Sequence, residues 1–344
     1  MKPIVFLFLL LGNFTPGNEK DSTAEYYQYI NNAEGKIIAN EWAAAIDLYE
    51  AMPADQLKMP DLYNYAMLCF HVGQQSEKLA DLYIEMYRKG FPDSLLNNKV
   101  FAPAFNSEVV VRAKKNMQAE RNRLLEKFAE NTKRLYTLYQ KDQAIFTYRV
   151  EHNMMKLNDS LAVLNNENIH AFLRFVTDKG FPSENNIGFV AYDNPFYSVI
   201  PLHCFQTCDS NLRQKMKIVL AQALSDNKIR PEQMILYRES GSEYDDGITG
   251  NSQFVLLDCN LYEIEDTDPL ILRQIDHFRN TIYLCSLNEF RQKILYKYQN
   301  PGQPFYLPVD LMYLSSDKMT LKDKNHFLEG RKLLFKEVPD CMIN

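Results

Sequence analysis

The sequence predicts a mainly α-helical protein with at most a minor β element. Near its amino end the chain repeats itself at a fixed interval, and apolar residues recur at α-helical spacing through most of the remainder. One short run, at residues 253–257, has the character of a strand. With 344 residues, 46% of them hydrophobic and 24% charged, the chain has a globular composition and room for two modest domains.

The repeat has a period of 34 residues. Asp47-Leu48-Tyr49 recurs as Asp81-Leu82-Tyr83, and at the same offset Tyr29 aligns with Tyr63. This is the tetratricopeptide period, so residues 22–105 are predicted to form tetratricopeptide-like helical hairpins. Two repeats are fewer than the roughly three that such stacks need for stability, so another element is expected to cover their open end.

A long helix is expected over residues 106–150, opening at Asn106-Ser107 and joining the two halves of the chain. One of its faces is apolar and the opposite face is rich in Lys, Arg and Glu. The apolar positions are Val110, Met117, Leu124, Phe128, Leu135, Leu138 and Ile145. This helix is the predicted cover for the repeats.

Helical patterns continue beyond the long helix and are followed by a C-terminal extension over 291–344. Helix starts are predicted where capping residues precede apolar runs, namely at Asn158, Asn194-Pro195, Asp209, Arg230-Pro231, Asp268-Pro269 and the capping box Ser286–Glu289. Pro201 should kink the helix that begins at Pro195. The extension is expected to hold an extended piece at residues 305–307 and a terminal helix.

The amino terminus resembles a signal peptide over residues 1–17. Met1-Lys2-Pro3 precedes eight apolar residues, 4–11, and Thr15-Pro16-Gly17 offers small residues for cleavage. An apolar run of this length is too short for a bilayer core, which needs about 20 residues. The expected location is therefore periplasmic or secreted, with no membrane span after cleavage.

Composition and motifs exclude several function classes. The net charge is −6 and no basic stripe is interleaved with aromatics, so a nucleic-acid partner is not expected. Gly250-Asn251-Ser252-Gln253 begins like a nucleophile elbow, but Phe254 stands where the second glycine must be. Neither a P-loop nor a Gly-x-Gly-x-x-Gly motif occurs, so no cofactor is predicted.

The six cysteines are too sparse to be a disulfide scaffold. Cys259 and Cys285 could pair, and the sequence leaves this open. His203, Cys204 and Cys208 lie within about a turn and a half, but no second close-spaced pair of ligands accompanies them, so no metal site is predicted.

One pattern of residues resembles a known family. Asp142-Gln143, Arg149, Gly180-Phe181-Pro182, Ile187-Gly188 and His203 follow one another in order, and Arg279 ends the run Asp276-His277-Phe278-Arg279. This pattern is similar to that of an uncharacterised bacterial family common in Bacteroidetes, the domain of unknown function 6624. The resemblance spans about 135–290. It implies a shared architecture and secretion, and it implies no reaction because the family has no assigned function.

The apolar stripe of the long helix contains an acid and a base. Steps of seven residues along one face lead from Phe128 through Leu135 to Asp142 and Arg149. Buried charges need partners, so these groups are expected to meet others from separate helices or to line a wet cleft. The candidate catalytic residues are His203 as general base, Asp142 as the group that orients it, and Arg149; candidate binding residues are Gln143, Arg238 and Arg279. The favoured alternative is a hydrogen-bonded network that fixes helix register.

The repeats suggest a second kind of function, in which their concave face binds a peptide or protein partner. Tyr29 and Tyr63 are candidate binding residues there, although packing between helices explains most tyrosines in such repeats. We therefore predict a non-enzymatic helical scaffold that binds a protein or peptide. The alternative is a hydrolase-like enzyme built on the Asp/Arg/His centre.

Overall fold

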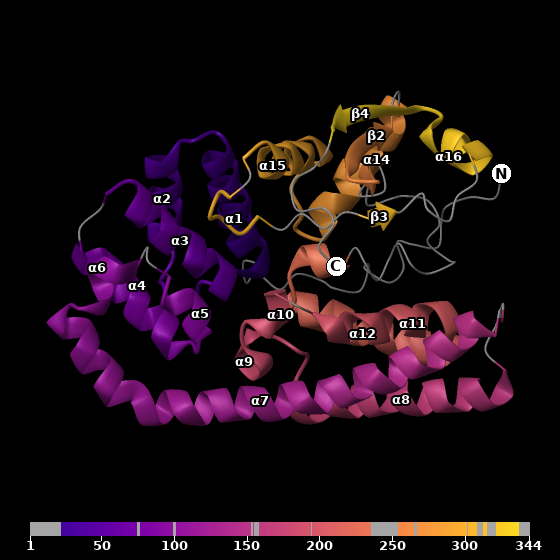
Figure 1. The fold of residues 1–344 in the computed structure, drawn as a ribbon, viewed down its shortest axis with the longest axis horizontal. Coiled ribbons are helices and arrows are strands. Elements are labelled where there is room, and N and C mark those ends of the chain that lie inside the picture. Colours follow the sequence, from indigo (N-terminus) through magenta and orange to yellow (C-terminus); the bar gives the residue numbers. More distant parts are fainter. Residues whose placement is uncertain are drawn as a thin grey trace.

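The computed structural model describes residues 22–73, 76–98, 101–152, 154, 158–193, 195–234, 254–264, 267–300, 302–307, 312–314 and 321–336. The predicted signal peptide, Arg238 and Cys341 lie outside these ranges. The described chain is mainly helical with one small sheet, which confirms the predicted fold class (Figure 1). None of its helices combines the length and apolarity needed to cross a bilayer.

The N-terminal module consists of two helical hairpins. These are α1 (Ser22–Ile38) with α2 (Trp42–Glu50), and α3 (Met59–His71) with α4 (Ser76–Arg88). Small buried residues, Ala33 and Ala45, let α1 and α2 approach closely, while the rings of Tyr49 and Tyr65 stack at 5.6 Å between α2 and α3. The helices of the two hairpins therefore pack through small and aromatic side chains.

The last hairpin is covered by a long helix. After two short helices, α5 (Asp93–Leu96) and α6 (Ala102–Phe105), α7 runs from Glu108 to Glu151 along one side of the molecule and packs against α4 (Figure 1). Ser107 caps α7 by accepting a hydrogen bond from the Val110 amide at 3.3 Å. The buried Arg121 guanidinium ties α7 to the end of α4 by donating to the carbonyls of Tyr87 and Phe91.

The second half begins with helices that fold back along α7. These are α8 (Asp159–Lys179), α9 (Glu184–Ile187), α10 (Val190–Asp193), the 3-10 turn η2 (Phe196–Ser198), α11 (Val199–Thr207) and α12 (Ser210–Ser225). At Gly188 a Cβ atom would lie 2.7 Å from the Phe128 ring, so only glycine lets α9 approach α7 this closely. The predicted kink at Pro201 is wrong: Pro201 lies in the first turn of α11, where a proline is tolerated.

The C-terminal third holds a four-stranded sheet with the strand order β3-β1-β2-β4. Its strands are β1 (Phe254–Leu257), β2 (Asn260–Ile264), β3 (Met312–Leu314) and β4 (Arg331–Phe335), and its helices are α14 (Pro269–Thr281), α15 (Leu287–Gln299) and α16 (Leu321–Leu328). β1 pairs antiparallel with β2 and parallel with β3, and β4 pairs antiparallel with β2. Phe254, Leu256 and Leu261 pack with Ile275, Phe290 and Ile294 in a second core.

The chain closes on itself, because the C-terminal third returns to the N-terminal module. Helix α15 packs against α1 (Figure 1). The Tyr283 ring stacks on Tyr27, with ring centroids 6.1 Å apart. The inner helices of the two hairpins, α1 and α3, therefore face the second half of the protein instead of an open groove.

Candidate functional site

Asp142 and His203 converge in the structure. The stripe along α7 places Asp142 in the interior with no exposed side-chain surface, and α11 brings His203 to it from the neighbouring layer. The Nδ1–H of His203 donates to Asp142 Oδ2 at 2.7 Å, and Gln143 Nε2 donates to the same oxygen at 3.1 Å. Asp142 Oδ1 is buried and makes no hydrogen bond with any described residue. Only one of the two carboxylate oxygens of Asp142 therefore accepts hydrogen bonds from described residues.

The His203 ring is held in place by stacking. Phe146, one turn along α7 from Asp142, lies against it with ring centroids 3.5 Å apart and planes 18° apart. The side chain of His203 is 13% exposed. A carboxylate on Nδ1 fixes the tautomer whose Nε2 carries a lone pair, which is the arrangement that proton transfer requires.

Arg149 lies seven residues after Asp142 on α7, near this pair. Its guanidinium carbon is 5.8 Å from the centre of the Phe146 ring, and its Nε donates to the Met154 carbonyl at 3.2 Å. Arg149 and His203 therefore both lie near the Phe146 ring. The three catalytic candidates share one region of α7 and α11, and a hydrogen bond joins Asp142 to His203 there.

The two cysteines after His203 are buried. A hydrogen bond with the Cys208 thiol, together with burial, raises the pKa of Cys204, so this thiol is a poor nucleophile near neutral pH. Within the described ranges no group of three or more His, Cys, Asp or Glu side chains could hold a metal ion. Cys69, Cys204, Cys208, Cys259 and Cys285 are unpaired, so the possible Cys259–Cys285 disulfide is not formed.

Arg279 does not join the Asp142–His203 pair, contrary to expectation. It lies on α14, fully buried, where its Nε donates to the Cys285 carbonyl at 2.7 Å and its guanidinium lies 4.8 Å from the centre of the Phe290 ring. Figure 1 places α14 beside the sheet and α11 beside α7. The apolar stripe of α14 does not indicate which of the two hydrophobic cores this helix packs against.

The tyrosines of the repeats mostly pack between helices. Tyr26, Tyr27, Tyr65 and Tyr83 are buried, and Tyr63 lies edge-on to Phe101 with ring centroids 6.2 Å apart. Burial raises the pKa of Tyr63. Tyr29 is half-buried on α1. For five of these six residues the contacts support the packing interpretation of the repeat.

A buried ionic cluster was not predicted from the sequence. Arg230 donates through Nη1 to Asp61 Oδ1 at 3.0 Å and through Nη2 to Glu34 Oε1 at 3.2 Å, and Lys293 pairs with the other oxygen of Glu34. Burial lowers the pKa of Arg230, but the carboxylates of Asp61, Glu232 and Glu34 raise it well above its ordinary value. The available signal was Glu34 itself, which lies at helical spacing between Ile30 and Ile37.

The inner face of α3 holds a non-helical segment of the same chain, residues 303–307. The Asn64 side chain donates to the Tyr306 carbonyl at 2.8 Å and accepts from the Tyr306 amide at 2.6 Å. Phe305 and Leu307, on either side of Tyr306, are buried. The Phe305 ring lies 5.7 Å from that of His71 at the end of α3. The Asn64 side-chain amide therefore forms hydrogen bonds with both the backbone N–H and the backbone C=O of Tyr306.

Comparisons of the chain with models of known protein families, with curated proteins and with solved structures find no match. The resemblance to the domain of unknown function 6624 stays a prediction. The function must therefore be argued from the geometry of these sites.

Proposed function

We propose that the protein is a helical-repeat scaffold that binds a non-helical peptide segment of a protein partner on the inner face of α3. The observation that carries the proposal is the pair of hydrogen bonds between Asn64 and the backbone of Tyr306. An asparagine amide offers a donor and an acceptor side by side, so it can hold any residue's backbone N–H and C=O. Recognition of this kind does not depend on the side chain of the residue whose backbone is bound by Asn64.

Specificity would come from the flanking side chains. Phe305 and Leu307, on the two sides of Tyr306, are both buried. This alternation is expected when a peptide is recognised through every second side chain. A partner segment that fits this surface would carry an aromatic residue, any residue, and then an aliphatic residue. Tyr306 is the residue in the middle, and its hydroxyl donates to the Tyr192 carbonyl at 3.3 Å.

The chain's own segment competes with such a partner. An intramolecular segment acts at an effective concentration that reaches about millimolar for short linkers, so a free peptide must overcome this advantage. Affinity should increase when the internal segment is weakened, provided that the groove itself is intact.

The experiment uses the full chain and a fluorescent peptide with the sequence of residues 302–308, Gly-Gln-Pro-Phe-Tyr-Leu-Pro. The double variant Phe305→Ala/Leu307→Ala should bind this peptide at least ten times more tightly than the wild type in fluorescence anisotropy. Adding Asn64→Ala should abolish the gain, while adding Asn122→Ala, on the exposed side of α7, should leave it unchanged. If the double variant binds the peptide no better than the wild type, the proposal fails.

A second candidate function rests on the 2.7 Å contact between Asp142 and His203. An imidazole oriented by a carboxylate can act as a general base, and a hydrolase-like reaction would use Nε2 to activate water. A panel of chromogenic carboxylic and phosphate esters tests it. Turnover that is lost in His203→Ala and strongly reduced in Asp142→Asn would support hydrolysis, whereas equal rates in the wild type and both variants would eliminate it.

The location of the protein is also a proposal. The apolar run at residues 4–11 supports export, with a final site in the periplasm or outside the cell. Amino-terminal sequencing of the protein from a cell-envelope fraction should find a chain that begins near residue 18. Recovery of an intact Met1 from the cytoplasmic fraction alone would contradict export.

A further inference from the structure

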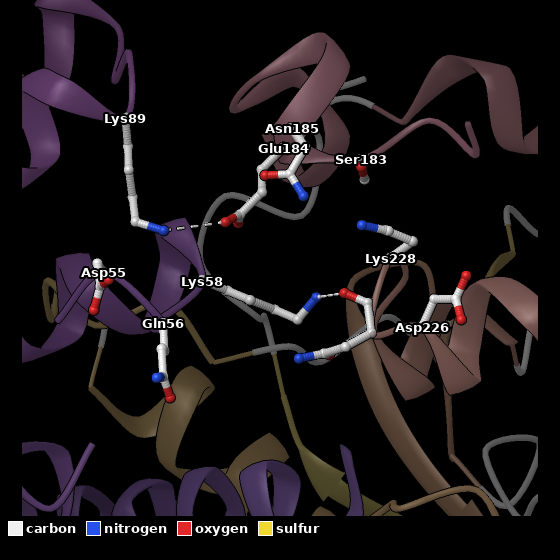
Figure 2. Close-up of a pocket in the computed structure, with 10 residues that line it drawn as sticks. Asp55, Gln56, Lys58, Lys89, Ser183, Glu184, Asn185, Asp226 and Lys228 are labelled. Atoms are coloured by element: carbon white, nitrogen blue, oxygen red, sulfur yellow. Dashed lines mark hydrogen bonds and ion pairs between the residues drawn. The ribbon is translucent and has the colours of Figure 1, made fainter. Parts of the chain in front are cut away.

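A second site lies between the N-terminal module and the helices that follow α7. It is a pocket of about 220 Å³ formed by the loop before α3, the end of α4, the start of α9 and the end of α12 (Figure 2). Pockets for drug-sized ligands measure roughly 300–1,000 Å³, so this one suits a small ligand. Its lining is polar and comprises Asp55, Gln56, Lys58, Lys89, Ser183, Glu184, Asn185, Asp226, Asn227 and Lys228.

The charges in this pocket are unevenly placed. Lys58 is 4% exposed, and Lys89 and Lys228 are half-buried, whereas the acids Asp55 and Asp226 are exposed. Figure 2 shows the ends of Lys58 and Lys228 pointing toward the same central space, with the two acids at its opposite sides. The inner part of the pocket is therefore cationic, and its rim is acidic.

Among the described residues that line the inner part of this pocket, the one carboxylate is Glu184, and its oxygens already have partners. Glu184 Oε2 accepts from the Met59 amide and from the Tyr192 hydroxyl, both at 2.8 Å, and Oε1 faces Lys89 at 3.5 Å. Among the described residues, neither Lys58 nor Lys228 has a carboxylate within ion-pair distance. Two ammonium groups in the inner part of the pocket thus lack a counter-ion.

Lys58 shows the electrostatic consequence most clearly. Its Nζ donates to the Asn227 carbonyl at 2.6 Å, which uses one of the three N–H donors of an ammonium group. Burial lowers the pKa of Lys58 to about 8, and the positive charges of Arg230 and Lys228 act in the same direction, while Glu184 and Asp61 oppose them. A negative charge is missing at this position, and a bound anion would supply it.

The geometry points to binding of a small dianionic oxyanion ligand, of the phosphate, sulfate or dicarboxylate class, by Lys58 and Lys228. The anion would neutralise the two unmatched ammonium groups and accept the N–H donors that Lys58 and Lys228 leave free. The acidic rim would favour ligands with a cationic group on their outer side. Because the pocket is formed by both halves of the chain, the bound ligand would also link them.

Calorimetric titration of the full chain with sodium sulfate, phosphate and succinate at constant ionic strength tests the proposal. Lys228→Gln and Lys58→Met should each weaken binding at least tenfold, whereas Lys215→Gln, an exposed lysine on α12, should leave it unchanged. Sulfate and phosphate bound in preference to succinate would identify a phosphoryl-type ligand, and the reverse order a dicarboxylate. Absence of binding in the wild type, or equal binding in all variants, would overturn the proposal.

The pH profile gives an independent readout. Sulfate keeps its charge between pH 7 and 9.5, so a change in its affinity reports the protein. Affinity should fall severalfold as Lys58 loses its proton. Burial and the charges of Arg230 and Lys228 lower the pKa of Lys58, whereas Glu184 and Asp61 raise it. Lys58→Arg keeps its charge throughout this range and should flatten the profile. A fall of equal size in Lys58→Arg would contradict the assignment to Lys58.

Discussion

Two buried polar centres of this protein differ in how completely their charges are paired. In the Arg230–Asp61–Glu34–Lys293 cluster each charged group faces an opposite charge, and the four side chains are almost fully buried. In the Asp142–His203 pair one carboxylate oxygen lacks a described partner, and the imidazole reaches solvent. The difference suggests that the first centre holds the chain together, whereas the second keeps unused hydrogen-bonding capacity.

The positions of the two centres agree with this distinction. The ionic cluster joins α1, α3, α15 and the segment after α12, which are far apart in the sequence. The Asp142–His203 pair joins only α7 and α11. Removing one member of the ionic cluster leaves other charges buried without a partner, whereas water can reach the partly exposed His203. The two centres should therefore respond differently to substitution.

The largest effect is expected for Arg230→Met. This change leaves Asp61 and Glu34 buried with too little positive charge, and removing one partner of a buried ion pair typically costs about 3–5 kcal/mol. Urea unfolding followed by circular dichroism measures the change. Arg123→Met, on the exposed side of α7, is the control and should change stability little. A loss below about 1 kcal/mol in Arg230→Met would remove the distinction between the two centres, since neutral hydrogen bonds contribute that much.

Lys58 is a third kind of buried charge, a cation without a carboxylate partner, and its effect depends on pH. Its pKa is about 8 in the folded protein and 10.5 in an unfolded chain. Between these values the unfolded state binds more protons, so the free energy of unfolding contributed by Lys58 rises with pH, by up to ~3 kcal/mol in total. Below pH 8 the full penalty of burying the ammonium group is present.

The measurement compares the wild type with Lys58→Met between pH 7 and 10.5. Tyrosines that titrate at high pH affect both proteins, so the difference between the two curves isolates Lys58. Relative to the variant, the wild type should gain stability as pH rises. A constant difference across this range would show that Lys58 titrates normally in the folded protein.

Asp142→Asn should have a smaller effect, about 1–3 kcal/mol. The substitution keeps the shape of the side chain but weakens the hydrogen bond from His203 and leaves a buried polar group poorly satisfied. Thermal unfolding measures the loss. Its size relative to Arg230→Met sharpens the comparison, because a loss as large as that of the arginine would make Asp142 an equally structural charge.

The smallest effect is expected for His203→Gln, at about 1 kcal/mol or less. A glutamine can still donate to Asp142, and the site is partly exposed, so water can replace what the imidazole loses. The variant loses the ring that stacks on Phe146. A loss of several kcal/mol in the same unfolding experiment would indicate a structural role and argue against hydrolysis.

The sequence predicted the helices well because their signals are local. The caps at Asn158, Asp209 and Asp268 and the capping box at Ser286 are each formed by residues close in the chain. Strands β2, β3 and β4 were missed, and β4 was included in a predicted terminal region of helix. All three are short. β3 and β4 pair with strands that are distant in the sequence, whereas β2 follows β1 directly across the turn at Asp258 and Cys259, so in that case a hairpin with a local partner was overlooked.

The candidate site was predicted only in part for the same reason. Asp142 was found because a charge interrupts an apolar stripe, and this reasoning also suggested a partner such as His203. The same reasoning could not show that Arg279 belongs to a different core from Asp142. An apolar stripe indicates that a helix face is buried, but it does not indicate which part of the protein covers that face. The Asn64 contact with Tyr306 joins residues 242 positions apart and leaves no trace in sequence patterning.

Amide hydrogen exchange at Tyr306 tests the central claim most directly, because this amide donates to the Asn64 side chain. In the wild type it should be protected, and an excess of the peptide of residues 302–308 should accelerate its exchange at least tenfold by displacing the internal segment. Amides in the core of α12 should be unaffected. Exchange at Tyr306 that does not change with the peptide, in both the wild type and Leu307→Ala, would contradict a peptide-binding groove on α3.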